Sequence, residues 1–494
     1  MQIIADLHIH SKYSRAVSQK MEILEIACWA KKKGIDLVAT GDWTHPLWLR
    51  EIKANLEEDG TGLLRLKRAA EVAHCRALRS PTKNFVAADR PSQTGANYVK
   101  QNFCGLPAPL FLLSTEISLI YSQAGKQRRI HNLVLAPSIA VAEKINQELM
   151  RKGANLASDG RPIIGLSAQE LVELVLGIDE NCLVIPAHIW TPWFSLFGSM
   201  SGFDSLDECF GKMSKYIYGI ETGLSSSPEM NWRIKELDNR SILSFSDAHS
   251  GPKLGRETTV FQIKAQSAKR KAQNYNKKIK TFSYQDVALA IKNDPNGDFE
   301  VGYTLEFYPE EGKYHYTGHR HCQVRQSPEE TKKLGRICPV CGKPLTVGVM
   351  HRVEQLAAQL LKTEDLRLKN DENGVRWISY QNRPPYVTLV PLLEILGEAL
   401  ESTPTSLKVQ NEYENLTAKF EGEFGVLLKA KVDEIAKITG EKIAEGILRV
   451  RSGQVLIEPG YDGVFGKVKI WKEGKDGTEG KEGKEKKKRQ LSLF

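Results

Sequence analysis

The sequence predicts an α/β protein whose first part is built on parallel strands and is followed by a cysteine-rich module and a mainly helical region. Three observations support this prediction. Over residues 1–265, apolar runs of strand length alternate with amphipathic or capped helical stretches, which is typical of a parallel sheet, open or closed into a barrel. Three cysteines are gathered within residues 322–341. Helical patterns then dominate residues 353–450.

The composition is that of an ordinary globular protein. The chain has 494 residues, of which 41% are hydrophobic and 26% are charged. At this length about three domains are expected, and a disordered chain, a collagen-like repeat and a small disulfide scaffold are excluded. No apolar run approaches the roughly 18–20 residues of a membrane-spanning helix, and residues 1–14 lack the pattern of a secretory signal. We therefore expect a cytoplasmic protein without membrane partners, and the net charge of +9 leaves nucleic-acid binding open.

The elements of the first part can be placed individually from their apolar runs. We expect strands at residues 3–5, 37–40, 111–115, 132–136, 183–187, 217–221 and 242–246. Composition shifts then divide the chain into a first domain at 1–300 with an insertion at 60–105, a metal-binding module at 301–352, a helical region at 353–471 and a charged tether at 472–494. The helical region is expected to end in a short β-type segment over residues 450–471.

Histidine and acidic residues lie at or just beyond the ends of nearly every expected strand. At a barrel mouth these ends converge, and so many buried polar groups would be strongly destabilising without a compensating ion. A mixed set of imidazoles and carboxylates fits Zn²⁺, Mn²⁺ or Fe²⁺ better than Ca²⁺. The candidate metal ligands are His8, His10, Asp42, His45, Glu116, His131, His188, Asp247 and His249.

The cysteine-rich segment predicts a structural zinc site. His319 and Cys322 form one pair, and Cys338 and Cys341 form a second pair with the same spacing. Two such knuckles are typical of a zinc ribbon, and four protein ligands leave no open position for catalysis. His315 or His321 could replace His319 as the fourth ligand.

Six motifs together resemble the polymerase-and-histidinol-phosphatase superfamily and, within it, the endonuclease Q family. They are DLHIH, GDWTHP, STEIS, RRIHNLVLAPS, PAHIWTPWFSLFGSMSGFDS and SDAHS. The resemblance implies a distorted (β/α)7 barrel with a zinc-ribbon-like module and a helical, DNA-binding C-terminal region. It also implies a cytoplasmic, nucleoid-associated enzyme that acts on DNA.

The resemblance further implies how the ligands are shared among two or three divalent ions, which would be Zn²⁺, Mn²⁺ or Mg²⁺. His8, His10, Glu116 and Asp247 would hold one ion and form the catalytic set, and Glu116 would bridge to a second ion held with His131 and His188. A third ion would use His249 and the segment from Asp42 to His45. Many relatives have a histidine directly after the aspartate of that segment, where this chain has Trp43.

The activity that the resemblance implies is endonucleolytic. The enzyme would nick DNA on the 5′ side of uracil, hypoxanthine, xanthine or an abasic site, in duplex and also in single-stranded DNA, leaving a 3′-hydroxyl and a 5′-phosphate. Arg128 and Arg129 are expected to hold the phosphate as guanidinium groups. Trp190, Trp193 and Phe194 follow a ligand directly and are expected to contact bases.

The chain ends in QLSLF, which resembles the sliding-clamp-binding peptide of bacterial proteins. Gln490, Leu491, Leu493 and Phe494 would bind the DNA polymerase clamp, because exposed apolar side chains after a charged tether are typical of a docking peptide. Two alternatives to the endonuclease interpretation remain. The chain could be a small-molecule phosphoesterase that uses the same ions, or a non-catalytic adaptor for DNA and the clamp.

Overall fold

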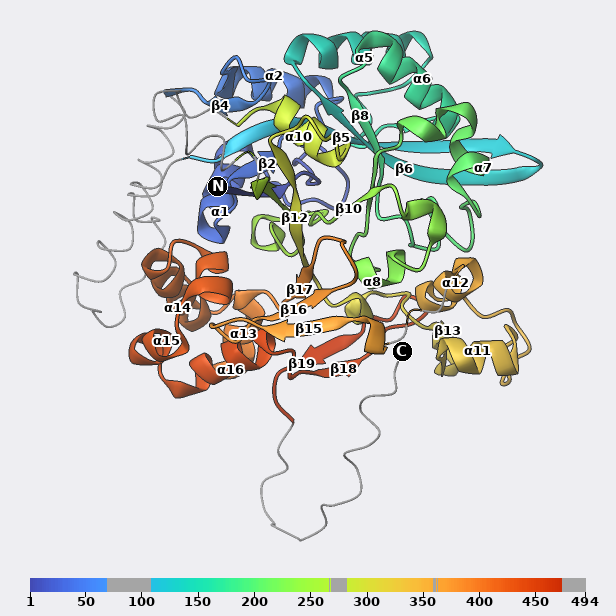
Figure 1. The fold of residues 1–494 in the computed structure, drawn as a ribbon. Coiled ribbons are helices and arrows are strands. Elements are labelled where there is room, and N and C mark those ends of the chain that lie inside the picture. The colour runs from blue at the N-terminus through green and yellow to red at the C-terminus, as the bar shows by residue number, and fades with distance from the viewer. Residues whose placement is uncertain (69–107, 266, 268–281, 359–360, 362, 473–494) are drawn as a thin grey trace.

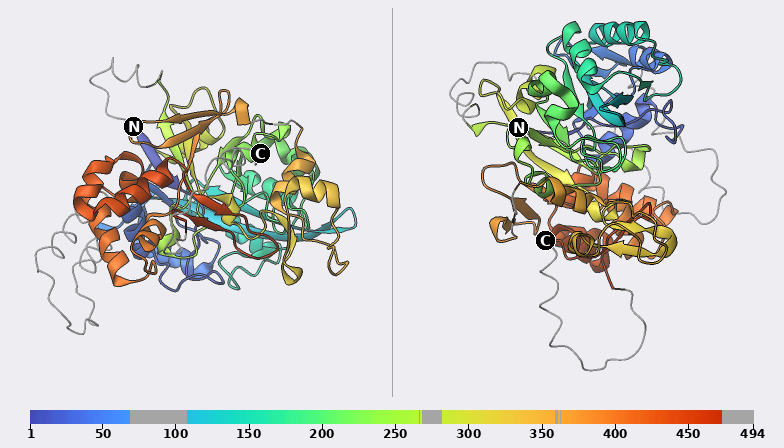
Figure 2. Two further views of the ribbon diagram at one scale, coloured as in Figure 1. Left: turned by 90° about the horizontal axis from the view of Figure 1, so that it is seen from below. Right: turned by 90° about the vertical axis from the view of Figure 1, so that its right-hand side faces the viewer.

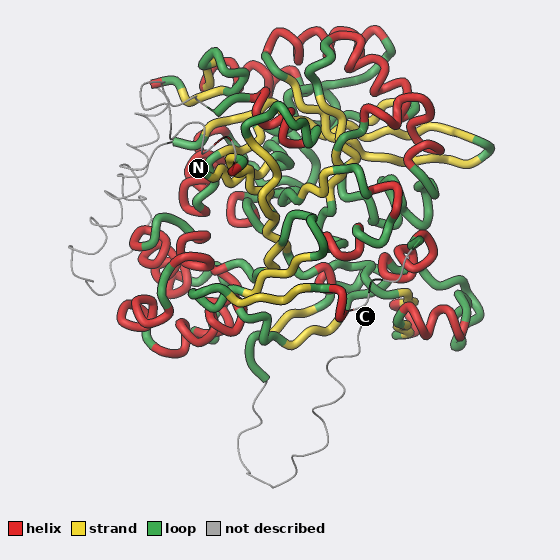
Figure 3. Tube along the Cα trace, viewed as in Figure 1, coloured by secondary structure: helices red, strands yellow, loops and turns green. Residues whose placement is uncertain are grey.

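The computed structural model describes residues 1–68, 108–265, 267, 282–358, 361 and 363–472 (Figure 1). Most of the expected insertion, and the tether with its clamp-binding peptide, lie outside the described residues. Helices and strands alternate through the first half of the chain, and the C-terminal helices gather in a separate cluster (Figure 3).

A central sheet runs through the molecule and has thirteen strands among the described residues. Its order is β15-β16-β17-β12-β11-β1-β2-β5-β4-β3, with β6 paired to β5 and β8, and β7 paired to β5. The strands are β1 (Gln2–Asp6), β2 (Leu37–Ala39), β3 (Leu56–Glu58), β4 (Leu64–Leu66), β5 (Leu110–Gln123), β6 (Lys126–Ala136), β7 (Ile163–Ile164), β8 (Leu183–Pro186), β11 (Thr258–Ile263), β12 (Phe299–Glu306), β15 (Arg367–Asn370), β16 (Arg376–Ser379) and β17 (Tyr386–Thr388).

Shorter strands pair outside this sheet. β9 (Gly219–Glu221) and β10 (Ser241–Leu243) are parallel to each other. β13 (Thr317–His319) and β14 (Val324–Gln326) form an antiparallel pair, and so do β18 (Leu456–Glu458) and β19 (Lys467–Lys469). The last pair confirms the β-type ending expected over residues 450–471.

The helices pack apolar faces on the sheet and on one another. Several begin at a serine that accepts a hydrogen bond from the first turn, as Ser167 does for α6 and Ser327 for α11. The helices are α1 (Ile23–Lys33), α2 (Pro46–Asn55), α5 (Ile139–Arg151), α6 (Ala168–Ile178), α7 (Leu206–Phe210), α8 (Pro228–Asn231), α10 (Tyr284–Ile291), α11 (Pro328–Leu334), α12 (Val349–Leu356), α13 (Leu392–Ala399), α14 (Leu407–Lys419), α15 (Val432–Thr439) and α16 (Glu441–Arg451). None of the described helices is long and apolar enough to cross a membrane.

Each of the seven expected strands falls on an observed strand, but the sheet is mixed rather than purely parallel. β1, β2 and β5 are parallel neighbours as expected. β6 runs antiparallel to β5, because Ala124 and Gly125 both adopt positive φ angles and turn the chain back on itself. Apolar periodicity predicts a strand but not its direction, so this hairpin was not expected.

The C-terminal half also differs in detail from the mainly helical region that was expected. β12 extends across the expected domain boundary at residue 300. It pairs with β17, and β15 and β16 add a further antiparallel ribbon to the same sheet. The helices α13–α16 then form a cluster on one side of this ribbon, and the module that contains α11 and α12 lies on the other side (Figures 1 and 2).

Candidate metal centre

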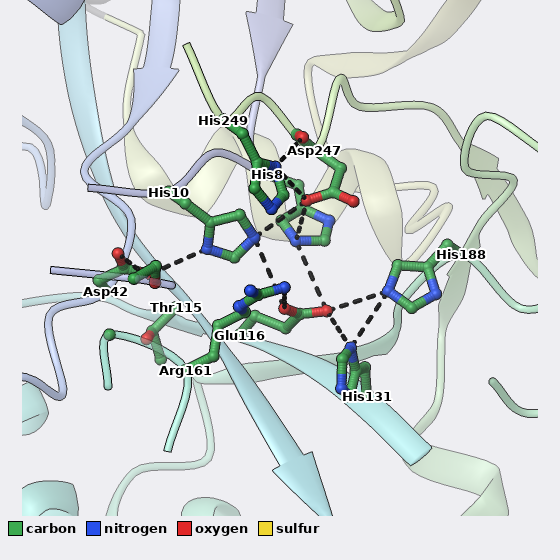
Figure 4. A network of polar contacts seen from close by, with 12 residues as sticks. His8, His10, Asp42, Thr115, Glu116, His131, Arg161, His188, Asp247 and His249 are labelled. Carbon is green, nitrogen blue, oxygen red and sulfur yellow. Dashed lines mark hydrogen bonds and ion pairs between the residues drawn. The ribbon is translucent and has the colours of Figure 1, made fainter. Parts of the chain in front are cut away.

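Four histidines and one aspartate of the candidate metal centre lie beyond the ends of short strands (Figure 4). His8 and His10 follow β1, and His188 follows β8. Asp247 and His249 follow β10. His188 and Asp247 have positive φ angles of 30° and 46°. Such strained backbone at residues other than glycine persists where the surrounding structure fixes it, and it is concentrated at functional sites.

Glu116 and His131 come from the interior of the β5–β6 hairpin rather than from a strand end. In the register of this hairpin His131 faces Ser118, two residues from Glu116. Both side chains therefore project from the same face of the pair. The hairpin therefore brings a carboxylate and an imidazole together although neither residue lies at the end of a strand.

Glu116 is the centre of the cluster. Its Oε1 lies 2.6 Å from Nδ1 of His131 and 3.0 Å from Nε2 of His188. The same oxygen is 3.8 Å from Nε2 of His8, and Oε2 is 3.5 Å from Nε2 of His10. The carboxylate is buried, which alone would raise its pKa, but these imidazoles hold the pKa of Glu116 well below its ordinary value.

Asp247 forms the other acidic side of the cluster. Its Oδ1 lies 3.0 Å from Nε2 of His10, 3.6 Å from Nε2 of His8 and 3.6 Å from Nδ1 of His249. Burial opposes ionisation of this group, but the three histidines lower the pKa of Asp247 far below its ordinary range. With 27% of its side chain exposed, Asp247 lies at the opening of the site, whereas Glu116 is only 1% exposed.

A second layer of carboxylates orients the histidines. Oε1 of Glu221 lies 2.8 Å from Nδ1 of His8, and Oε2 accepts a hydrogen bond of 2.7 Å from the backbone N–H of His188. Oδ1 of Asp42 lies 3.0 Å from Nδ1 of His10. Burial would lower the pKa of both imidazoles, but the surrounding carboxylates raise that of His8 to about 10 and that of His10 to about 9. Carboxylates behind ligating histidines are a general feature of protein metal sites.

These residues fit divalent ions. Ligand atoms lie within 4.8 Å of one another in three overlapping groups, which are His8–His10–Glu116, His10–Asp247–His249 and Glu116–His131–His188. Nε2 of His8 and Oε2 of Glu116 are buried and have no hydrogen-bond partner among the described residues. Buried polar atoms of this kind are costly unless something binds them, and imidazoles and carboxylates suit Zn²⁺ and Mn²⁺.

Asp42 and His45 do not join these three groups. Oδ2 of Asp42 accepts hydrogen bonds from Ser11 and Ser14, and its other oxygen faces His10. His45 stacks on Tyr13 with ring centroids 4.4 Å apart. The expected third site, with ligands from this segment, is therefore not assembled as the sequence suggested. Asp42 contacts Nδ1 of His10. His249 forms a group of possible ligands with His10 and Asp247 instead.

The residues expected to contact phosphate, Arg128 and Arg129, have different surroundings. Arg128 is buried, donates to the carbonyl oxygen of Gly202 and pairs with Glu208 at 2.9 Å. Its guanidinium group is thus used within the fold and does not form the expected phosphate fork. Arg129 lies over the ring of Phe194, 5.6 Å from its centroid.

The three aromatic side chains after His188 have different surroundings. Trp190 is 1% exposed and donates to Asn231, so it is not available to bases. The ring of Trp193 packs against that of Tyr314, and the two ring centroids are 5.6 Å apart. Phe194 is partly exposed, and its ring centroid lies 4.8 Å from that of His131.

Sequence reasoning missed two charged residues of the centre. Glu221 ends the expected strand at 217–221 and carries the same signal, an acidic residue at a strand end, that identified the other ligands. Arg161 lies in a loop before β7, and its Nη1 is 3.7 Å from Oε2 of Glu116. The loop has no motif that marks it, so Arg161 could not be recognised before the fold was known.

The cysteine cluster assembles as a second candidate site. Ligand atoms of His319, Cys322, Cys338 and Cys341 lie within 4.8 Å of one another. His315 is not part of this group, and burial lowers its pKa to about 4. The donor set of three thiols and one imidazole fits Zn²⁺, and among the three candidate histidines the geometry favours His319.

Two solved structures share the fold of this protein over nearly the whole chain. A lesion-specific endonuclease from Pyrococcus furiosus, PfuEndoQ, has a TM-score of 0.71 and 27% identity over 95% of this chain and 96% of its own. An endonuclease Q bound to a 27-mer duplex with an abasic lesion at its active site has a TM-score of 0.72 and 28% identity, covering 96% of this chain and 98% of that one.

Proteins of similar sequence show the family to which this chain belongs. The uncharacterized protein YqxK of Bacillus subtilis is 30% identical over 361 residues, which are 72% of this chain and 78% of YqxK. The uncharacterized protein MJ0043 of Methanocaldococcus jannaschii is 32% identical over 296 residues, and the match spans only 32% of its length. The family model of the MJ0043 C-terminal domain matches residues 391–454, which contain α13–α16.

The fold and the site define a hydrolase of the endonuclease Q type, with a side-chain cluster suited to divalent ions. The expected enzyme class and the α/β fold are confirmed by this likeness. Within that class, the chain belongs to the family of Bacillus subtilis YqxK.

Proposed function

We propose that this protein is a metal-dependent DNA repair endonuclease that nicks the strand on the 5′ side of deaminated bases and abasic sites. The observation that carries the proposal is that two groups of ligand atoms share the buried Glu116 carboxylate in a chain with the fold of endonuclease Q. A shared carboxylate is the arrangement expected for a pair of ions that act on one phosphodiester.

Bound divalent ions would supply activated water and would neutralise charge on the phosphodiester. Residues of the chain would hold these ions and orient the groups that bind them. Glu116 and the imidazoles of His8, His131 and His188 are fixed from behind by the β5–β6 hairpin and by Glu221. In the net reaction the water oxygen bonds to phosphorus, the bond from phosphorus to the 3′ oxygen breaks, and that oxygen leaves with a proton.

The lesion specificity is proposed from the likeness to endonuclease Q. The solved complex holds a duplex with an abasic lesion at the active site, and we propose that a nucleotide rotated out of the helix reaches the same site in this chain. Phe194 is the aromatic residue placed to stack on a base, because it is partly exposed beside His131. Uracil, hypoxanthine and xanthine are the bases that we propose to be recognised.

The test is a nicking assay on otherwise identical duplexes that carry cytosine, uracil, hypoxanthine or an abasic site, with and without a chelator. We expect cleavage only at the lesions and none with the chelator. Asp247→Asn should lower nicking by at least about a hundredfold while the protein still binds lesion DNA in a fluorescence anisotropy assay, since the substitution keeps the size of the side chain.

The alternatives give different results in the same experiment. Hydrolysis of a generic phosphomonoester without nicking of any duplex would indicate a small-molecule phosphoesterase. A metal content of about one ion per chain with no hydrolysis of either substrate would indicate a non-catalytic adaptor. Either result would refute the proposal.

We also propose a structural zinc ion at His319, Cys322, Cys338 and Cys341, and a contact of the surrounding module and the C-terminal helices with DNA. Cys338→Ser should remove one equivalent of zinc in a metal analysis. For the C-terminal peptide, we propose binding to a bacterial sliding clamp. Deleting residues 490–494 should abolish capture of the clamp and leave cleavage of short oligonucleotides unchanged.

A further inference from the structure

Arg161 places a guanidinium group at the edge of the metal centre (Figure 4). Nη1 lies 3.7 Å from Oε2 of Glu116, and 22% of the Arg161 side chain is exposed. Burial alone would lower the pKa of this group, but the charges of Glu116, Asp247 and nearby aspartates raise it. A permanent positive charge therefore stands between the ligand cluster and solvent.

The loop that carries Arg161 is packed directly against the second layer of the centre. A Cβ atom on Gly160 would lie 2.4 Å from Oδ2 of Asp42 and 2.3 Å from Oγ of Ser14, so only glycine fits there. The N–H of Gly160 donates to the carbonyl oxygen of Tyr13 at 3.0 Å, and its own carbonyl accepts from the Thr44 hydroxyl at 3.2 Å. These contacts fix the position from which the Arg161 side chain extends.

In the described part of the structure, most N–H groups of the Arg161 guanidinium have no hydrogen-bond partner. A separation of 3.7 Å from Glu116 is too long for a hydrogen bond. Among the described residues, the guanidinium group donates one bond, from Nη2 to the carbonyl oxygen of Arg15 at 3.3 Å. The buried guanidinium group of Arg451, in contrast, donates to four carbonyl oxygens. Arg451 is thus committed to the fold, whereas Arg161 keeps donors free beside the ligand cluster.

We propose that Arg161 binds a non-bridging oxygen of the phosphate that is hydrolysed, and so forms an anion subsite beside the metal ions. This inference rests on the proposed function, because it assumes a phosphate ester as substrate. Guanidinium groups bind two phosphate oxygens at once in a fixed geometry. Charge grows on the non-bridging oxygens as water adds to phosphorus, so a fixed cation there stabilises the transition state more than the bound substrate.

The role expected from the sequence for Arg128 and Arg129, which lie on β6, is thereby assigned to a residue of the loop before β7. Arg128 is occupied by Gly202 and Glu208, and Arg129 donates to Gln127 at 2.8 Å. In the described part of the structure neither guanidinium group forms an ion pair with a carboxylate of the ligand cluster, whereas Nη1 of Arg161 lies 3.7 Å from Oε2 of Glu116. Arg161 is therefore the arginine that the fold directs at the reacting phosphate.

The experiment compares Arg161→Met and Arg161→Lys with wild type in the full-length, Mn²⁺-loaded protein. Binding of inorganic phosphate is measured by calorimetry, nicking of an abasic duplex by single-turnover kinetics, and metal content by elemental analysis. Arg151→Met is the matched control, because Arg151 is 75% exposed on α5 and pairs only with Glu148 in the described structure. We expect Arg161→Met to weaken phosphate binding about tenfold and to slow nicking about a hundredfold, with Arg161→Lys intermediate and the metal content and Arg151→Met unchanged.

Two outcomes would overturn the assignment. Unchanged phosphate affinity in Arg161→Met would show that the guanidinium group does not bind the anion. Loss of metal ions in that variant would show that Arg161 acts only by holding Glu116. Failure of the proposed function is distinguishable: a wild-type protein that nicks no lesion, but whose phosphate affinity still depends on Arg161, would have the subsite and a different phosphate ester as substrate.

Discussion

At the scale of single residues, Glu306 makes stability depend on pH. This carboxyl group on β12 is fully buried, and burial raises its pKa from 4.5 to about 7 although Ser244 and Thr304 donate hydrogen bonds to it. Above pH 4.5 the unfolded chain releases a proton that the folded protein keeps. The free energy of unfolding therefore falls as the pH rises from about 4.5 to about 7, and then levels off.

Glu306→Gln should remove this dependence, because the amide has the same shape and never ionises. We expect the variant to be more stable than wild type at pH 8 by up to about 3 kcal/mol, and equal to it at pH 4.5. Urea unfolding at the two pH values measures both differences. An equal shift at both pH values would mean that packing, not ionisation, causes the effect.

The residues of the metal centre show what a sequence can and cannot predict at this scale. His8, His10 and Asp247 can be predicted as candidate ligands, because acidic and imidazole side chains just beyond strand-like runs are visible in the sequence. The same signal was present for Glu221 and was overlooked. Arg161 carries no such signal, since an arginine in a polar loop is most often solvated, and only the contact of Gly160 with Asp42 shows that its loop reaches the centre.

At the scale of elements, α12 holds the loop that follows His188. Nε of Arg352 donates to the carbonyl oxygen of Phe197 at 3.0 Å, and Nη2 donates to that of Phe203 at 3.1 Å. The same loop meets the metal centre where the backbone N–H of His131 donates to the carbonyl oxygen of Phe194 at 3.1 Å. The cysteine-rich module is thereby connected to His131, a proposed metal ligand, through the loop that follows His188.

Arg352→Ala should loosen this loop without displacing the proposed metal ligands, which strands and their ends hold. We expect amide hydrogen exchange at residues 194–204 to become faster by about tenfold or more, while exchange in α5 stays the same. The KM for lesion DNA should rise several-fold with the metal content unchanged. Arg352→Lys keeps one donor and should lie between the two. Unaltered exchange in the loop would refute the connection.

The direction and pairing of elements were the least predictable part of the fold. An alternation of apolar and helical stretches predicts strands, and the seven expected ones exist, but it contains no information on which edges they share. The turn at Ala124 and Gly125 makes β6 antiparallel. Strands β15–β17 lie in a region whose sequence predicts mainly helices, because they are short. β15 and β16 pair with each other, and β17 joins them to the distant strand β12.

At the scale of the whole molecule, a buried ion pair joins the end of α1 to the region of the C-terminal helices. Nζ of Lys33 at the end of α1 lies 2.7 Å from Oε2 of Glu423, and their side chains are 1% and 3% exposed. The Tyr413 hydroxyl and the backbone N–H of Leu392 also donate to Glu423. A lysine in the last turn of a helix is ordinarily solvated, so no pattern in the sequence predicts a partner hundreds of residues away.

Lys33→Met should therefore destabilise both regions together, because it leaves a carboxylate buried without its counter-ion. Breaking a buried pair from one side costs about 3–5 kcal/mol, and we expect a loss of this size in the free energy of unfolding by urea. Adding Glu423→Gln should restore much of the loss, since the amide carries no charge, its oxygen can accept from the backbone N–H of Leu392, and its NH2 group can donate to the Tyr413 hydroxyl oxygen. Lys53→Met is the control, because Lys53 pairs with Glu143 at the surface, where both side chains are 40% or more exposed, and such pairs contribute less than about 1 kcal/mol. If Lys33→Met changed stability no more than this control does, or if the second substitution made the loss larger, the two regions would not be coupled through this pair.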